Sequence, residues 1–287
     1  MASMKEIKRR RAAIQSTAQI TKAMKLVATV KLQKARVRAE QSKPYFTIMY
    51  QTIESMLEKS ENVDHKYLKK NKGGKKAVLV ITGNRGLAGG YNSAVSRLVA
   101  DKFESIDTLI YTVGRKGRDQ LLHRGFELKG DFSQIVEDPI YNDAADITKL
   151  LLSDYESGEI SEIYVVYTNF KNTVVHDPIC LKLLPISKEE LLKPDTREEG
   201  PRALMNYSPN EDEVLSAIIP KYISSVIYGG LMQSIASENG ARMTAMDSAT
   251  SNAQELIDKL GLQYNRARQS AITQELTEIV AGANAIE

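Results

Sequence analysis

The stretch Lys75-Lys76-Ala77-Val78-Leu79-Val80-Ile81-Thr82-Gly83 decides the class of fold, because a short apolar run closed by glycine is typical of a buried strand. Three further strand-like runs follow it, at residues 108–114, 163–168 and 173–184. Helical patterns lie between them, at residues 93–103, 116–123 and 144–155. Strands that alternate with helices of this length predict a mostly parallel sheet with helices packed on it. The middle of the chain is therefore predicted to be a compact α/β domain.

The amino-terminal segment has a different pattern. Residues 1–72 contain no glycine, and Pro44 is their single proline. Apolar or small residues recur in steps of three, four or seven, at Ile7, Ile14, Ala18, Met24, Ala28, Leu32, Ala35 and Ala39. A second set, Ile20, Ala23, Val27 and Val30, is expected to widen this stripe. The spacing predicts a helix of ~80 Å, at 1.5 Å rise per residue, which Pro44 is expected to bend.

The carboxyl-terminal segment repeats the helical spacing. Its apolar or small positions are Leu215, Ile219, Tyr222, Val226, Leu231, Ile235, Met246, Ala249, Ala253, Leu256, Leu260, Tyr264, Ala267 and Ala271. Pro220, the Gly229-Gly230 pair, Gly240 and Gly261 are expected to weaken the helix locally, by ~1 kcal/mol for each glycine. Both terminal helices exceed the usual length of about 8–20 residues. This favours a projecting pair made from the two chain ends over an ordinary helical hairpin, and residues 186–212 read as a charged linker.

The charge is distributed unevenly along 287 residues whose formal net charge is only +3. Residues 1–43 carry twelve Lys or Arg and two acids, whereas residues 211–287 carry five Lys or Arg and ten acids. A basic start and an acidic end predict that the two ends meet. Cys180 is the only cysteine, so an internal disulfide is excluded and a reducing compartment is expected. The chain shows neither an apolar run of 18 residues nor a secretory signal.

The glycine cluster Thr82-Gly83-Asn84-Arg85-Gly86-Leu87-Ala88-Gly89-Gly90-Tyr91 is the strongest candidate for a phosphate site, since it follows a strand and precedes a helix. It lacks the GK[ST] of a P-loop and the G-x-G-x-x-G spacing of a dinucleotide site. We therefore expect a tight turn, with a positive φ at Gly86, although Arg85 offers a cation to an anion. The alternative function is an independent anion- or nucleotide-binding α/β protein with a helical oligomerisation stalk.

Other chemistry finds little support in the sequence. No Cys/His pair has the spacing of metal ligands, and no G-x-S-x-G elbow is present. Basic residues cluster at Lys8-Arg9-Arg10-Arg11, yet the first aromatic residue is Tyr45, so nucleic-acid binding is not favoured. The sequence therefore predicts no catalytic residue, no cofactor and no metal site.

Several motifs identify a family resemblance. They are Ile20-Thr21-Lys22-Ala23-Met24-Lys25-Leu26-Val27-Ala28, Arg85-Gly86-Leu87-Ala88-Gly89-Gly90, the segment 228–246, and the segment 267–280. Over its whole length the chain resembles the gamma subunit of F-type ATP synthases, of the bacterial type. The resemblance implies a Rossmann-like α/β domain, residues 75–190, inserted between long helices at residues 1–60 and 210–287. In that family the two terminal helices form an antiparallel, left-handed coiled coil.

The resemblance also implies a function. The family's gamma subunit is a central-stalk rotor, which transmits rotation of the membrane c ring to the catalytic sites of the alpha/beta hexamer for ATP synthesis or hydrolysis. Proton flow drives the rotation. The implied partners are the alpha and beta subunits, the epsilon subunit and the c ring. A non-catalytic subunit without a cofactor is expected, peripheral to the cell membrane on its cytoplasmic side.

The matched motifs imply which residues contact the beta subunit. These are Arg268, Gln269, Thr273, Glu275, Glu278, Arg242, Met24 and Lys25. Met24 and Lys25 are expected on the opposing helix near the level of Arg268 and Gln269. Met24 has a purely packing interpretation as well, and Glu275 and Glu278 have a solvated one.

Overall fold

The computed structural model describes residues 4–59, 65–69, 71, 73–173, 175–186 and 211–284. The chain divides into two compact units, one made of residues 1–28 and 242–287 and the other of residues 29–241. The first unit is helical, and the second holds a five-stranded sheet. Most of the predicted linker at residues 186–212 lies outside the described residues.

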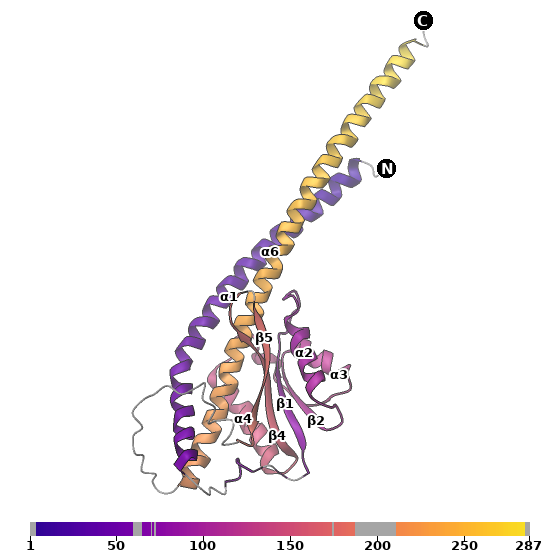
Figure 1. The fold of residues 1–287 in the computed structure, drawn as a ribbon. Helices are drawn as coiled ribbons and strands as arrows, with labels where there is room; N and C mark the ends of the chain where they lie inside the picture. Colours follow the sequence, from indigo (N-terminus) through magenta and orange to yellow (C-terminus); the bar gives the residue numbers. More distant parts are fainter. Residues whose placement is uncertain are drawn as a thin grey trace. The chain divides into compact units, whose positions relative to one another are not determined.

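The sheet of the second unit has the order β3-β2-β1-β4-β5. Figure 1 labels β2, β1, β4 and β5. Its strands are β1 (Lys75–Ile81), β2 (Thr108–Val113), β3 (Glu127–Asp131), β4 (Ile160–Phe170) and β5 (His176–Leu184). The first four strands run parallel, and β5 pairs with β4 antiparallel. The predicted mostly parallel α/β sheet is confirmed.

Two apolar layers sandwich this sheet, because alternate residues of a strand point to opposite faces. Val78 and Val80 of β1 face the helices α2 (Tyr91–Lys102) and α3 (Arg115–Leu122). Leu79 and Ile81 face the helix α4 (Tyr141–Glu156) together with parts of the two terminal helices. The long helices thus complete the core on one side of the sheet.

The strand β3 was not predicted. Its sequence is Glu-Leu-Lys-Gly-Asp, and its residues alternate between exposed and half-buried. An edge strand needs no continuous apolar run, because one of its edges has no strand partner and its side chains lie at the rim of the core. Local hydrophobicity therefore could not identify it.

The two terminal helices are α1 (Met4–Lys59) and α6 (Glu211–Asn284), and α1 is continuous through Pro44. α6 is equally continuous through its glycines, although these were expected to weaken it. A Cβ at Gly240 would lie 3.0 Å from Cε1 of His176, and one at Gly230 would lie 3.3 Å from Cδ1 of Tyr167. These two glycines allow the close approach of α6 to the β4-β5 hairpin.

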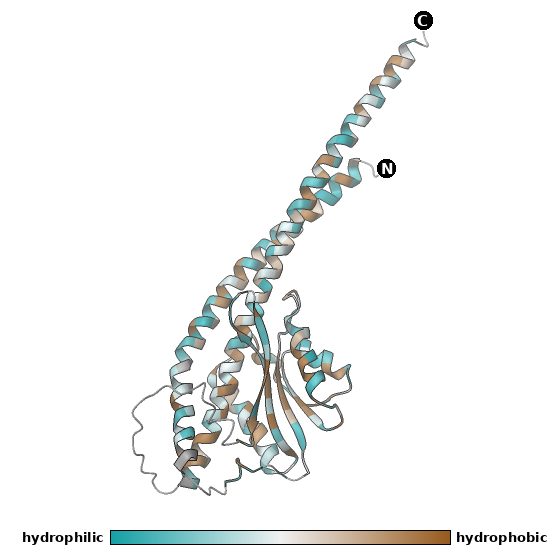
Figure 2. Ribbon diagram, in the orientation of Figure 1, coloured by the Kyte–Doolittle hydropathy of each residue, from teal (hydrophilic) through white to brown (hydrophobic). Residues whose placement is uncertain are grey.

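Burial confirms the first apolar stripe and corrects the second. Ile7, Ala28, Leu32 and Ala35 are buried, at 7% exposure or less. The second set does not widen the stripe, because Ile20, Val27 and Val30 are 57–60% exposed. The alternation of apolar and polar residues along both helices is visible in Figure 2. These three apolar side chains therefore lie on the surface of the chain and not in its internal seam.

The helix α6 also contains an 18-residue window that is long and apolar enough to cross a membrane. Of this window, 56% is buried inside the protein. A helix that packs in a protein core has the same composition, so the window is weak evidence for a membrane span.

Candidate coupling surface

The carboxyl edge of the sheet is where a doubly wound α/β fold binds its ligand, at the point where the strand order reverses. Here the order reverses between β1 and β4. β1 pairs with β4 only as far as Val166, whereas β4 continues to Phe170. The last backbone groups of β4 therefore extend past the end of β1.

The helix α6 occupies this position. The Thr168 amide donates to the Ser234 hydroxyl at 3.3 Å, and the Ser237 hydroxyl donates to the Thr168 carbonyl at 3.2 Å. The Glu238 carboxylate, only 8% exposed, lies so close to Gly83 that a Cβ there would be 2.6 Å from its Oε1. The crevice that takes a nucleotide in related folds is filled here by the chain's own side chains.

The glycine cluster forms a turn between β1 and α2. Asn92 fixes it by accepting the Gly83 amide at 2.8 Å and donating to the Arg85 carbonyl at 3.2 Å. Leu87 and Gly89 have positive φ values, 62° and 55°, whereas Gly86 does not. The expectation for Gly86 was wrong, because the left-handed conformation falls on the residues that follow it.

Arg85 pairs with a carboxylate of its own chain. Its Nη2 lies 3.3 Å from Oε1 of Glu137, whose Oε2 accepts from Nζ of Lys31 at 3.2 Å. The Arg85 side chain is 80% exposed, so this pair contributes little to stability. The arrangement offers no enclosed anion site, and the anion-binding alternative is not favoured.

One constellation has the residue types of a hydrolase triad but the wrong geometry. Nε2 of His65 lies 2.9 Å from the Ser216 hydroxyl and 3.9 Å from Oδ1 of Asp212, while Nδ1 accepts the Tyr67 amide at 3.2 Å. A relay needs the serine and the carboxylate on opposite ring nitrogens. Burial lowers the pKa of His65, and this residue ties the chain after α1 to the start of α6.

The remaining nucleophile and metal candidates give no site. Cys180 is half-buried, and burial raises the pKa of its thiol, which keeps it in the unreactive protonated form. Within the described ranges no three His, Cys, Asp or Glu residues are grouped as metal ligands.

In the helical unit, polar contacts that the sequence did not reveal join α1 to α6. The hydroxyls of Thr21 and Thr250 are 2.7 Å apart, and Nζ of Lys25 donates to Oδ1 of Asp247 at 2.5 Å. Rising numbers on α1 meet falling numbers on α6, so the helices are antiparallel. The prediction that the two chain ends pair is confirmed.

The eight predicted contact residues all belong to this helical unit, but they form two groups. Met24, Lys25 and Arg242 are half-buried near Asp247. Arg268, Gln269, Thr273, Glu275 and Glu278 are exposed on α6. About 30 Å of helix separates Asp247 from Arg268, at 1.5 Å per residue. Met24 and Lys25 are therefore not at the level of Arg268 and Gln269, because the antiparallel register places Arg268 near the amino end of α1.

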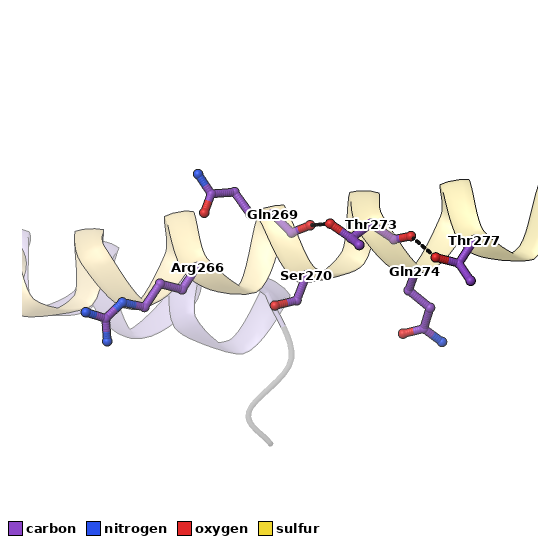
Figure 3. Close-up of a pocket in the computed structure, with 6 residues that line it drawn as sticks. All are labelled: Arg266, Gln269, Ser270, Thr273, Gln274 and Thr277. Atoms are coloured by element: carbon purple, nitrogen blue, oxygen red, sulfur yellow. Dashed lines mark hydrogen bonds between the residues drawn. The ribbon is translucent and has the colours of Figure 1, made fainter.

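The last turns of α6 carry an exposed polar and apolar surface. Figure 3 shows Gln269 pointing to the side of the helix opposite Ser270, and the hydroxyl of Thr273 donates to the Gln269 carbonyl at 2.9 Å. Beyond Ala271 every described side chain is exposed. The large apolar ones, at 48–67% exposure, are Ile272, Leu276, Ile279 and Val280. Their spacing of three and four residues places them along one side of the helix.

Together, an antiparallel helix pair and an α/β domain whose ligand crevice is filled define the class of this protein. Comparisons with known proteins identify its family. A family model described as ATP synthase matches residues 3–286. The ATP synthase gamma chain of Lachnoclostridium phytofermentans is 56% identical over 290 residues, with 100% of both chains covered. The sodium ion specific gamma chain of Acetobacterium woodii is 42% identical, with 99% of both covered.

A solved structure agrees in fold. A chain of the Euglena gracilis mitochondrial ATP synthase, OSCP/F1/c-ring in rotational state 3, aligns with a TM-score of 0.67 at 17% identity. The alignment covers 99% of this chain and 94% of that one. The chain belongs to the ATP synthase gamma chain family. It is the central-stalk rotor of an ATP synthase, a membrane-associated complex.

Proposed function

We propose that this subunit is non-catalytic and acts as the shaft that transmits rotation of the c ring to the catalytic sites of the alpha/beta hexamer. The observation that carries the proposal is the exposure of large apolar side chains near the carboxyl end of α6. Ile272, Leu276, Ile279 and Val280 are large, apolar and 48–67% exposed. Covering such side chains with another protein is stabilising, by ~25 cal/mol for each Å² of apolar area removed from water.

Two levels of the shaft contact the beta subunits in this proposal. Arg268 and Gln269, with Thr273, Glu275 and Glu278, form the level near the carboxyl end. Met24, Lys25 and Arg242 form the level near Asp247. The guanidinium of Arg268 has five N–H donors in a fixed, planar arrangement, and the side-chain amide of Gln269 adds an NH2 donor group and a carbonyl acceptor. Arg268 and Gln269 are therefore suited to hold a carboxylate and a hydroxyl on one beta subunit.

The mechanism is selection among conformations. The three catalytic sites are alike in composition, whereas the shaft presents a different face to each. A conformation is stabilised only by as much as its contacts differ between states. A charge-assisted hydrogen bond is worth ~1.5–3 kcal/mol net, enough to bias a site without blocking the next step of rotation.

The remaining partners follow from the same proposal. The α/β domain, residues 75–190, meets the epsilon subunit and the c ring, and residues 1–60 and 210–287 enter the hexamer. The subunit is then peripheral to the cell membrane on its cytoplasmic side, and proton flow drives the rotation. Copurification with alpha, beta, epsilon and c subunits tests the partners.

Nucleotide titration separates the shaft from the anion-binding alternative. We expect the purified full-length chain to show no micromolar ATP site, because Glu238 and Ser237 of α6 fill the crevice between β1 and β4. The measurement is isothermal calorimetry with Mg-ATP, and Arg85→Ala is the matched variant. A micromolar site in the parent chain that disappears in Arg85→Ala would overturn the purely mechanical role.

A further inference from the structure

We propose that Thr21 and Thr250 are positioning residues that set the axial register of α1 against α6. Both belong to the helical unit, and their hydroxyl oxygens are 2.7 Å apart. Thr21 is 9% exposed, so its hydroxyl lies inside the seam. A buried polar residue in a coiled-coil seam is a known means of specifying register.

A hydrogen bond crosses the seam whichever of the two hydroxyls donates. When the Thr250 hydroxyl donates to the Met246 carbonyl at 2.7 Å, its oxygen accepts from the Thr21 hydroxyl at 2.7 Å. When the Thr250 hydroxyl donates to Thr21 instead, the Thr21 hydroxyl donates to the Ala18 carbonyl at 3.1 Å. In both arrangements the two hydroxyls link α1 to α6 and each proton has an acceptor.

The alanines of the seam specify register weakly. Ala28 and Ala253 are buried, at 1% and 6% exposure, and Ala18 and Ala249 are half-buried. Alanines have the same shape at every turn, so sliding one helix by a turn exchanges one alanine contact for another. Steric fit at these alanine positions therefore distinguishes neighbouring registers poorly.

A slip of one turn removes both polar contacts at once. Thr21 would then face Met246 or Gln254 instead of Thr250. Lys25 would face Met243 or Ser251 instead of Asp247, with which it pairs at 2.5 Å. The lysine and aspartate side chains are 38% and 58% exposed, so the hydroxyl pair contributes the better protected contact. A neutral hydrogen bond of ordinary strength corresponds to about fivefold in population.

The register matters for the shaft because it fixes which residues stand at one level. It places Met24 and Lys25 beside Asp247, and it leaves α6 beyond Ala271 without a partner in the described part of α1. The effect on coupling, as distinct from the register itself, rests on the proposed function.

The register is measured by disulfide equilibria in the full-length chain carrying Cys180→Ser. One cysteine pair is Ala18→Cys with Ala253→Cys, which are in register because they lie three residues from Thr21 and Thr250. The other pair is Ala18→Cys with Ala249→Cys, which is one turn out of register. Each double variant is equilibrated in a glutathione buffer, and mass spectrometry gives the ratio of the two disulfide equilibrium constants.

We expect Thr21→Val, which keeps the shape and removes the hydroxyl, to lower this ratio about fivefold. Thr21→Ser retains the hydroxyl and should retain the ratio. Thr17→Val is the matched control, because the Thr17 hydroxyl is exposed and donates to the Ala13 carbonyl of its own helix at 3.1 Å. A parental ratio in Thr21→Val, with unchanged helix content, would overturn the proposal.

The double variant Thr21→Val with Thr250→Val separates register from stability. Replacing both partners by apolar groups of the same shape leaves stability nearly unchanged, so melting should stay near the parental value while the ratio remains low. Recovery of the parental ratio would show that packing sets the register and would overturn the proposal. If the ratio falls but the complex carrying Thr21→Val couples ATP hydrolysis to ion pumping normally, the register assignment stands and the proposed contact levels are wrong.

Discussion

Arg268 is an exposed guanidinium on α6, at a level near the amino end of α1. We expect Arg268→Leu to lower turnover or assembly of the complex about tenfold or more, as loss of one charge-assisted hydrogen bond implies. The fold of the isolated chain should not change, because an exposed side chain leaves no cavity.

Arg266→Leu is the matched control for this prediction. Arg266 is exposed on the same helix, and at about 3.6 residues per turn a residue two positions before Arg268 points to nearly the opposite side. Steady-state ATP hydrolysis of reconstituted complexes is the measurement. Equal losses in the two variants would indicate a general effect of charge and would remove Arg268 from the contact.

A pH dependence follows from the buried histidines. Burial lowers the pKa of both His65 and His176, so the folded state favours their neutral forms. Their contribution to stability is complete above the unfolded pKa of about 6.5 and is lost as the pH falls toward the lower folded pKa. We expect the free energy of unfolding, measured by urea titration, to decrease from pH 7 to pH 5.5, by up to about 1.4 kcal/mol per pH unit for each histidine. His65→Gln should reduce this slope, and an unchanged slope would contradict the assignment.

The sequence revealed single residues only where their pattern was local. Ile7, Ala28, Leu32 and Ala35 were predicted in the seam because helical periodicity marks them. Thr21 with Thr250 and Lys25 with Asp247 were missed because their pairing depends on the register of segments more than 220 residues apart. The proximity of Glu238 to Gly83 was missed for the same reason, because these residues are far apart in the sequence.

At the scale of elements, the glycines of α6 have different roles. Gly261 has open space where a Cβ would be, whereas a Cβ at Gly240 would lie 3.0 Å from His176 and 3.2 Å from Phe170. We expect Gly261→Ala to raise the free energy of unfolding by about 1 kcal/mol through helix propensity. Gly240→Ala should gain less or destabilise the chain, because the hairpin must move. Urea unfolding followed by circular dichroism tests both, and equal gains would argue against a close approach at Gly240.

Element boundaries followed from local hydrophobicity in the core and failed at its rim. β1, β2 and β4 were predicted because they are continuous apolar runs buried on both faces. β3 was missed because an edge strand is half polar. The exposed set Ile20, Val27 and Val30 was wrongly assigned to the internal seam, because periodicity shows that a face is apolar without showing which molecule covers it.

At the scale of the whole molecule, the α/β domain has the sheet of a ligand-binding fold, but side chains of its own helix α6 fill the crevice where a ligand would bind. Ser234 and Ser237 hydrogen-bond to Thr168 near the end of β4, and Glu238 lies against Gly83 after β1. These contacts lie at the point between β1 and β4 where related folds bind a ligand. The absence of a P-loop from the sequence and the filled crevice in the structure therefore agree: this edge of the sheet is not built to bind a nucleotide.

Coupling is a property of the shaft inside its complex, and Met24 tests it. Met24 is half-buried beside Lys25, whose Nζ already pairs with Asp247 at 2.5 Å. The Asp247 carboxylate is already paired with Lys25. The new ammonium group of Met24→Lys should therefore pair with an acidic group on a beta subunit, which would stabilise one rotational position of the shaft over the others. We expect coupling to fall more than nucleotide binding does. ATP hydrolysis and ATP-driven ion pumping are measured on the same membranes, with Met24→Leu as the control that keeps an apolar side chain. If the ratio of pumping to hydrolysis in Met24→Lys equals the parental ratio at every temperature, Met24 does not lie at a coupling contact and the level assigned to it in the hexamer is wrong.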